Sequence, residues 1–183
     1  MITVGIAGGT CSGKTTLSEN LEKLLVSSGK RVKVIHMDAF FKKTPPNTIA
    51  PFTGIEYVEH NHPDSFELER FYQTIEDAKN DASNDVVIVE GLLVLYLKES
   101  REKFDIRVFV DLPSDERLIR RIHKFMALRN QTMDEIADRY LDTVRYRHAE
   151  FVEPTRWYAD MVVNGNGTKG AEILTAYVLK ELE

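Results

Sequence analysis

Residues 2–15 read ITVGIAGGTCSGKT, and this stretch decides the fold because a short apolar run leads directly into a glycine-rich turn. Within it, Gly8–Thr15 fits the pattern G-x-x-x-x-G-K-[ST] without a mismatch. The glycines let the backbone turn tightly, so that successive N–H groups face one point, and the helix that follows presents its positive N-terminus there. Lys14 then reaches the β- and γ-phosphates of a nucleotide, and the Thr15 hydroxyl can ligate Mg²⁺.

The alternative interpretation of this motif is a glycine-rich turn that matches by coincidence. We favour phosphate binding, because the motif follows a predicted strand and opens a predicted helix, as the chemistry requires. The residues expected to bind the nucleotide are Gly8, Gly9, Thr10, Cys11, Ser12, Gly13, Lys14, Thr15 and Thr16.

Composition limits the class of protein. The chain has 183 residues, 43% hydrophobic and 29% charged, which is typical of one globular domain spanning residues 1–183. Its net charge of −5 provides no positive field for nucleic acid or for an anionic membrane. The single cysteine, Cys11, cannot form an internal disulfide, and no basic region precedes the first apolar run, so we expect a cytoplasmic protein. Whether it forms a homo-oligomer stays open.

Strand and helix patterns alternate along the chain. Apolar runs predict strands at 2–6, 31–37, 86–89, 106–112 and 160–163, and helical periodicity predicts helices over 14–28, 66–79, 133–151 and 171–182, with a basic helix from about 114. Asp64 or Ser65 is the expected cap of the second helix. Residues 42–62, which include Pro45, Pro46 and Pro51, predict a long exposed loop. Alternating elements favour a parallel α/β sandwich.

Three carboxylates fall at the carboxyl ends of predicted strands, where ligands bind in open α/β sheets. Glu90, after four apolar residues, suits a role on Mg²⁺, and otherwise it is a satisfied strand-end carboxylate. Asp38 could orient or deprotonate an acceptor hydroxyl and help hold Mg²⁺, and otherwise it is a turn residue before an aromatic pair. Asp111 is interpreted mainly as a helix-entry residue.

A basic helix follows the fourth strand. The sequence RLIRRIHKFMALR, residues 117–129, contains no acid, and Arg117, Arg121 and Lys124 share one helical face. Near a phosphate site, such a cluster, with Arg129, suggests clamps on a transferring phosphoryl group. The alternative is a solvated face, or ion pairs with Asp115 and Glu116.

A second glycine pattern, G-x-G-x-x-G at Gly165–Gly170, follows the last strand. A dinucleotide site needs an acidic residue about 20 positions further on, and too few residues remain. We therefore expect a turn there, or a loop against the adenine ring.

Taken together, the segments GGTCSGKTTL, MDAFF, HPDSFE, VVIVEGLLVLY, FDIRVFVDLPSDERLIRRI and YLDTVRYRHAEFVEPTRWYADMVVNG resemble the uridine kinase family of P-loop nucleoside kinases. The resemblance covers most of the chain outside residues 42–60. It implies a sheet of strand order 2-3-1-4-5 with an arginine-bearing helical lid at about 117–131. It also implies transfer of phosphate from ATP, or GTP, with Mg²⁺, to a ribonucleoside 5′-hydroxyl.

By the same resemblance, Asp38 would be the catalytic acid, Thr15 and Glu90 would serve Mg²⁺, and Arg121, Lys124 and Arg129 would occupy lid positions. Lys14 would complete the catalytic set. The acceptor would lie against the 40–64 segment, where Phe40, Tyr57, His60, His62 and Asp64 are candidate contacts, although a loop histidine is often merely solvated.

The chain also departs from that family. Uridine kinases usually carry a tyrosine- and histidine-containing hairpin over the base, and residues 68–85 show no equivalent. Lys124 and Gln131 stand where the family usually has arginine, and lysine lacks the bidentate fork of arginine. Nicotinamide riboside kinases, which share the aspartate followed by two phenylalanines, provide the nearest alternative acceptor. A P-loop ATPase or switch without a small-molecule acceptor is the alternative from another class.

Overall fold

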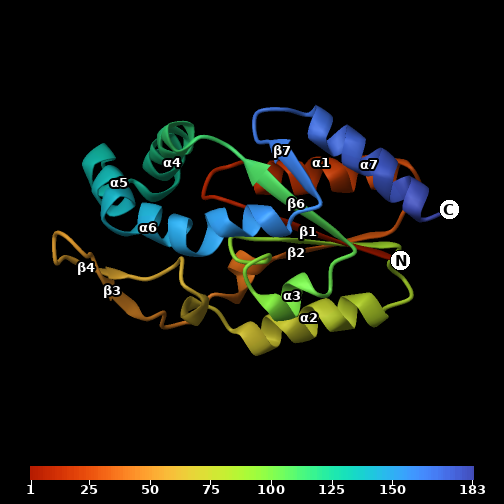
Figure 1. Cartoon of the computed structure of the whole chain (residues 1–183), viewed down its shortest axis with the longest axis horizontal. Helices are drawn as coiled ribbons and strands as arrows, with labels where there is room; N and C mark the ends of the chain where they lie inside the picture. Colours follow the sequence, from red (N-terminus) through yellow and green to blue (C-terminus); the bar gives the residue numbers. More distant parts are fainter.

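A five-stranded parallel sheet forms the centre of the molecule in the computed structural model, which describes all residues, Met1–Glu183 (Figure 1). Its order is β2-β5-β1-β6-β7, which confirms the predicted 2-3-1-4-5 order of the five sheet strands. The strands are β1 (Ile2–Gly8), β2 (Val32–His36), β5 (Val86–Glu90), β6 (Ile106–Asp111) and β7 (Met161–Asn164). β5 is buried along its whole length, as expected for a sheet covered on both faces.

Helices cover both faces of the sheet and enclose two apolar cores. On one face, α1 (Lys14–Ser27) and α7 (Lys169–Glu181) pack through Leu17, Leu21 and Leu174. On the other face, α2 (Leu68–Asn80), with α3 (Lys98–Arg101) beside it, covers a core that includes Phe71 and Phe109. None of the helices has the length and apolar character needed to cross a membrane.

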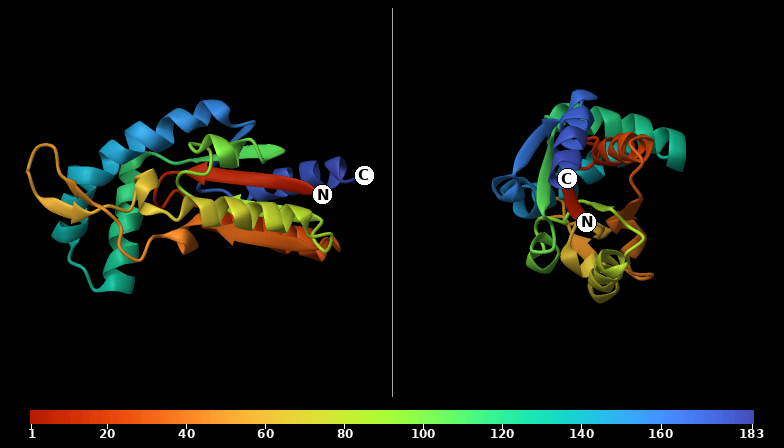
Figure 2. Two further views of the ribbon diagram at one scale, coloured as in Figure 1. Left: turned by 90° about the horizontal axis from the view of Figure 1, so that it is seen from below. Right: turned by 90° about the vertical axis from the view of Figure 1, so that its right-hand side faces the viewer.

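A long helical region begins beyond the carboxyl ends of the strands and then returns over one face of the sheet (Figure 1). α4 (Ser114–Arg129) ends at Asn130, whose left-handed backbone turns the chain, and α5 (Met133–Arg139) begins with a capping box between Thr132 and Glu135. The chain then continues through π-helical turns and α6 (Arg145–Arg147) to residue 158. Figure 2 shows that this region and the sheet together give an elongated molecule, with both termini at the opposite end.

The prediction of an exposed loop at 42–62 is wrong in one respect, because this segment contains a β-hairpin. β3 (Asn47–Ile49) and β4 (Glu56–Val58) pair antiparallel, and Gly54, with φ of 72°, lies in the turn between them. The hairpin projects beside α5 and α6 (Figure 1) and is held there by side chains. The Tyr57 hydroxyl donates to Asp142 (2.8 Å), and Arg147 donates to Thr48 (3.3 Å).

The second helix begins later than predicted, at Leu68, and neither Asp64 nor Ser65 caps it. Residues Pro63–Ser65 instead form a separate 3₁₀ turn, and the Ser65 hydroxyl donates to the Glu59 carbonyl (3.0 Å). Phe66 then pairs with Phe41 as an isolated bridge. These contacts tie the start of α2 to the segment that follows β2.

Candidate functional site

The phosphate loop joins β1 to α1 and adopts an unusual backbone. Cys11 and Gly13 both have positive φ, 57° and 104°, so the loop curls back over the start of the helix. The first turn of α1 leaves backbone N–H groups without acceptors in the helix, and the Ser12 hydroxyl is buried without a partner. An anionic phosphate would supply the missing acceptors, so the loop fits the ligand that the motif predicts.

Lys14 begins α1 and lies inside this loop. Its ammonium donates to the Gly9 carbonyl (3.0 Å). Burial lowers the pKa of Lys14, while Glu90 and Asp38 act in the opposite direction through their negative charges. The Lys14 ammonium and the carboxylates of Glu90 and Asp38 therefore lie close enough for their charges to interact.

Glu90 is the last residue of β5, and β5 lies between β1 and β2 in the sheet. In the parallel registers it lies opposite Ile6 of β1 and His36 of β2. One carboxylate oxygen accepts from the Thr15 hydroxyl (3.3 Å) and lies 2.8 Å from His36 Nδ1. Carboxylate and hydroxyl oxygens are the ligands that Mg²⁺ prefers, and Mg²⁺ usually shares its shell with substrate phosphates. The donor set therefore fits the metal that the sequence predicts.

Asp38 lies in the 3₁₀ turn Met37–Phe40 that follows β2. Asp38 is an exposed residue that lines the cavity, and the protein groups around its carboxyl group partly desolvate it. This desolvation raises the pKa of Asp38, and the Lys14 ammonium partly offsets the effect. A raised carboxyl pKa next to a cation is typical of functional sites.

The arginines of α4 divide into two groups. Arg117, expected on the lid, is instead buried (3% exposed): Nε donates to the Leu112 carbonyl (3.0 Å), and a Cβ on Gly9 would lie 2.5 Å from Nη1. It does not line the cavity, because the first turns of α4 pack against the phosphate loop. Arg121 Nη1 donates to the Thr10 hydroxyl (3.0 Å), and burial lowers the pKa of Arg121 to about 10, so it stays cationic.

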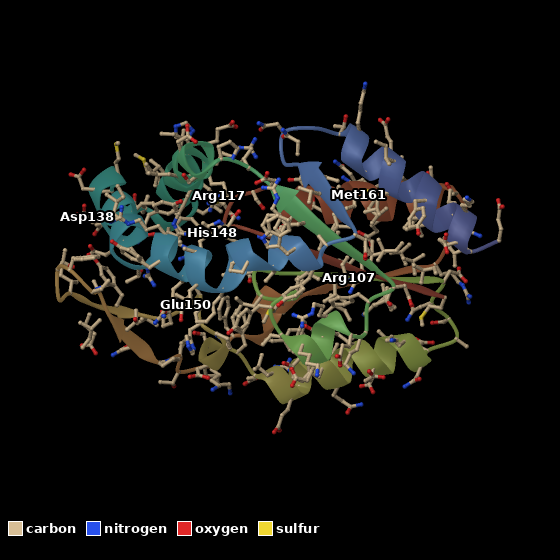
Figure 3. All side chains as sticks on the ribbon, viewed as in Figure 1. Arg107, Arg117, Asp138, His148, Glu150 and Met161 are labelled. Atoms are coloured by element: carbon tan, nitrogen blue, oxygen red, sulfur yellow. The ribbon has the colours of Figure 1, made fainter.

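A histidine lies beside Arg117, on the helical segment that includes α6 (Figure 3). His148 Nε2 is 3.0 Å from Glu153. Burial and the Arg117 charge lower the pKa of His148 to about 4, so the ring is neutral at neutral pH. His148 therefore lies where Arg117, which supports the phosphate loop, meets the long helical region.

One cavity of about 670 Å³ opens beside the phosphate loop and collects most of these groups. One side is the phosphate loop with α4. The opposite side, which we call the hairpin wall, consists of Phe41, Lys42, Lys43, Pro45, His60 and Asn61, on the two segments that flank the hairpin. The remaining lining residues include Asp38, Glu90, Leu92, Arg120, Lys124, Phe125, Leu128, Arg129 and Arg139.

Several candidate acceptor contacts lie elsewhere. Phe40 is buried in the core against Phe71, and Tyr57 binds Asp142. His62 caps the Pro63–Ser65 turn by accepting from the Asp64 backbone N–H, and neither residue lines the cavity. Of the residues named as acceptor contacts in the sequence, Asp38 and His60 line the cavity.

Sequence reasoning missed several lining residues and neighbours. Lys42, Lys43 and Arg139 gave no motif, and Arg139 is brought to the cavity only by the turn between α4 and α5. His36 was also missed, although its position beside Glu90 could have been predicted from the sequence. Because the second and third sheet strands are neighbours, His36 and Glu90 end side by side.

The two other strand-end features have structural roles. Asp111 pairs with Arg156 (2.9 Å) and does not line the cavity. Gly165, at the start of the second glycine pattern, packs so closely on the phosphate loop that a Cβ there would lie 1.8 Å from the Ser12 carbonyl oxygen. This glycine serves close packing between two loops.

Comparisons with known proteins agree with this geometry. Residues 59–171, more than half of the chain, match the model of the "Phosphoribulokinase / Uridine kinase family". The chain belongs to this family. Members of the phosphoribulokinase/uridine kinase family are phosphotransferases that act on an alcohol group, so the chain is a kinase.

Two curated relatives in this family are uridine kinases. That of Chlamydia pneumoniae is 33% identical over 91% of this chain and 82% of its own length. That of Lactiplantibacillus plantarum is 32% identical over 97% of this chain and 94% of its own length. A solved phosphoribulokinase from Rhodobacter spheroides superposes with a TM-score of 0.63 at 14% identity, covering 91% of this chain and 73% of that one, which supports the fold.

Proposed function

We propose that the chain transfers the γ-phosphoryl group of ATP to the 5′-hydroxyl of a ribonucleoside, with Mg²⁺ as cofactor, in the cytoplasm. The observation that carries the proposal is the position of Asp38. Its carboxyl group faces the same cavity as the phosphate loop and is coupled electrostatically to Lys14 and Glu90. An acceptor hydroxyl entering from the hairpin wall would meet Asp38 before it meets the phosphates.

Positioning and charge neutralisation supply most of the catalysis of phosphoryl transfer. The free N–H groups at the start of α1 would bind the phosphate oxygens, and Lys14 would exchange the Gly9 carbonyl for a phosphate. Asp38 would accept a hydrogen bond from the acceptor hydroxyl and take its proton as the new O–P bond forms and the bond from the γ-phosphorus to the departing ADP breaks.

The cofactor would lie next to Thr15 and Glu90. When bound, Mg²⁺ neutralises negative charge on the β- and γ-phosphates. His36 holds one Glu90 oxygen at 2.8 Å, which fixes the carboxylate in place for this role. We include Asp38 as a further candidate ligand.

The lid proposal covers residues 117–131. Arg121 already contacts the phosphate loop through Thr10, and Lys124 and Arg129 line the cavity further along α4. Closure of the C-terminal turns of α4 over the phosphates would bring Lys124 and Arg129 onto the transferring group and exclude water, while the first turns stay packed on the loop. The buried Arg117 would serve as a fixed support of the loop.

The test is Asp38→Asn in the full chain with Mg²⁺ and ATP. Transfer to uridine, cytidine or nicotinamide riboside should fall by about 10³-fold or more, while ATP binding is retained. The matched control is Asp111→Asn, a strand-end aspartate outside the cavity, which should keep near-normal activity. Near-normal turnover by Asp38→Asn would overturn the role of Asp38.

The acceptor class has a separate test. Uridine, cytidine, nicotinamide riboside and the unrelated alcohol pantothenate are compared as acceptors, with ATP consumption measured alongside product. ATP hydrolysis that no acceptor stimulates would favour an ATPase or switch and would contradict the proposal.

A further inference from the structure

The charge of the cavity is opposite to that of the molecule. The chain has a net charge of −5, yet eight cationic side chains line the cavity against the two carboxylates of Asp38 and Glu90. The cations are Lys14, Lys42, Lys43, Arg120, Arg121, Lys124, Arg129 and Arg139. None of them forms an ion pair with a carboxylate, whereas Arg31, Arg70, Arg107, Arg147 and Arg156 elsewhere all do.

Some of these cations belong to the phosphate side. Lys14 lies in the loop, Arg121 binds Thr10, and Arg120 contacts the carbonyl of Gly165, which packs on the loop. Lys124 influences the pKa of both Lys14 and Asp38, so its charge lies near both of these groups. The triphosphate, partly neutralised by Mg²⁺, accounts for this set.

Of the remaining cations, Arg129 packs on the Phe125 ring at the end of α4, and three lie on the hairpin-wall side of the cavity. Lys42 and Lys43 belong to the hairpin wall. Arg139, at the end of α5, faces the same wall: it donates to the Val58 carbonyl and lies with its guanidinium carbon 5.7 Å from the centre of the Tyr57 ring. The ATP phosphates do not account for these three charges.

His60 marks the centre of this second cluster. Its Nδ1 is buried without a hydrogen-bond partner, and the ring packs edge-on against Phe41 at 5.2 Å. Burial lowers the pKa of His60, and the positive charges of Arg139 and Arg129 lower it further. Lys42, Lys43 and Arg139 thus give this wall a positive charge that no carboxylate ion pair neutralises, and an anion bound against the wall would neutralise it.

We propose that the acceptor carries a negatively charged group, a carboxylate or a phosphate, which Arg139, His60 and the two lysines of the hairpin wall bind while Asp38 takes the reacting hydroxyl. The inference rests on the proposed function and narrows its substrate to acidic acceptors. A guanidinium can bind a carboxylate or phosphate through two parallel hydrogen bonds, which makes Arg139 the main determinant of this preference.

The experiment uses pairs of acceptors that differ mainly in one charged group. Uridine is compared with orotidine, its carboxylated counterpart, and nicotinamide riboside with nicotinic acid riboside; a pentose phosphate tests the phosphate form. The carboxylated member of each pair should have the higher kcat/KM, by about 10- to 100-fold. Equal values, or a preference for the neutral members, would overturn the inference and leave the nucleoside kinase proposal intact.

Transfer only to the pentose phosphate would have the opposite meaning. It would support an acidic acceptor and overturn the ribonucleoside proposal. The two proposals therefore fail under different outcomes.

Arg139→Met then tests the residue. It should lower kcat/KM for the anionic acceptor much more than for the neutral one, mainly through KM, and so remove the preference between them. Arg145→Met removes the same charge from an exposed site outside the cavity and should change neither value. An unchanged preference in folded Arg139→Met would overturn the role of Arg139.

A binding measurement supports the kinetics without turnover. The pKa of His60, followed by NMR of the histidine rings, should rise when orotidine is added and stay constant with uridine, because a bound anion favours the protonated ring. His62, which lies outside the cavity, should not respond. A His60 pKa that is unaffected by orotidine and by the pentose phosphate would contradict anion binding at this wall.

Discussion

The phosphate loop and the hairpin wall border the same cavity, but they are held by different kinds of contact. The loop is anchored in the sheet by β1 and supported from below by Arg117, which is 3% exposed. The hairpin wall has no backbone hydrogen bond to the sheet. Its position depends on side chains from the long helical region, such as Arg147 and Arg139.

A single glutamate shows how the hairpin wall is fixed. Glu59 is 2% exposed, and each of its two carboxylate oxygens accepts a hydrogen bond from a different donor. One accepts from Arg147 (2.8 Å), and the other accepts from the Asn61 backbone N–H (2.7 Å). This buried charge pair is thus one of several side-chain contacts that position the wall, whereas backbone geometry positions the loop. The two halves of the site should therefore respond to substitution independently.

The largest effect is expected from a substitution on the phosphate side of the cavity. Lys14→Met removes the cation that neutralises the transferring group, and kcat should fall by about 10³-fold or more in steady-state kinetics. Lys33→Met, an exposed lysine on β2 outside the cavity, is the matched control and should retain activity. Activity within tenfold of the unchanged chain would show that Lys14 is not the phosphate ligand.

A smaller and more selective effect is expected on the hairpin wall. Glu59→Gln weakens the contact with Arg147 and so loosens Asn61 and His60. KM for the acceptor should rise by about 10-fold while KM for ATP stays within about 2-fold, and the free energy of unfolding should fall by about 1–3 kcal/mol. Glu56→Gln, an exposed change in the same hairpin, should affect neither KM. A parallel rise in both KM values would contradict the independence of the two walls.

The smallest effect concerns stability and its pH dependence. Because burial raises the folded-state pKa of Asp38, ionising this group costs the folded state more than the unfolded chain. Its unfavourable contribution therefore develops as pH rises through the two pKa values and persists above them. Asp38→Asn should raise Tm at pH 7–8, by about 2–4 °C for each kcal/mol gained, and the gain should vanish in acid. A Tm difference that does not depend on pH would contradict this account.

Much of the fold could be predicted because its signals are local. The alternation of apolar runs and helical periodicity gave the class of fold, and the loop before Lys14 is specified within eight residues. The resemblance to a known family then supplied the order of the strands. Glu90 could be placed because a buried strand ends there.

The hairpin wall could not be predicted in the same way, because its partners are distant in sequence. Pro45, Pro46 and Pro51 argued against strands, but the short pairing of β3 with β4 avoids them. What stabilises the hairpin is contact with Asp142 and Arg147, about 90 residues away. Arg117 was misplaced for a related reason: helical spacing groups residues on one face but does not say what packs against that face.

The side-chain attachment of the hairpin has a practical consequence for engineering. β3 and β4 pair only with each other, so the five-stranded sheet would keep all its backbone hydrogen bonds if the hairpin were exchanged. A graft of a longer or differently charged hairpin between Pro46 and Glu59 would therefore leave in place both the sheet and the hairpin wall, whose residues lie outside this segment. The two ends of such a graft are already joined by a backbone hydrogen bond from Glu59 to Pro46 (2.8 Å).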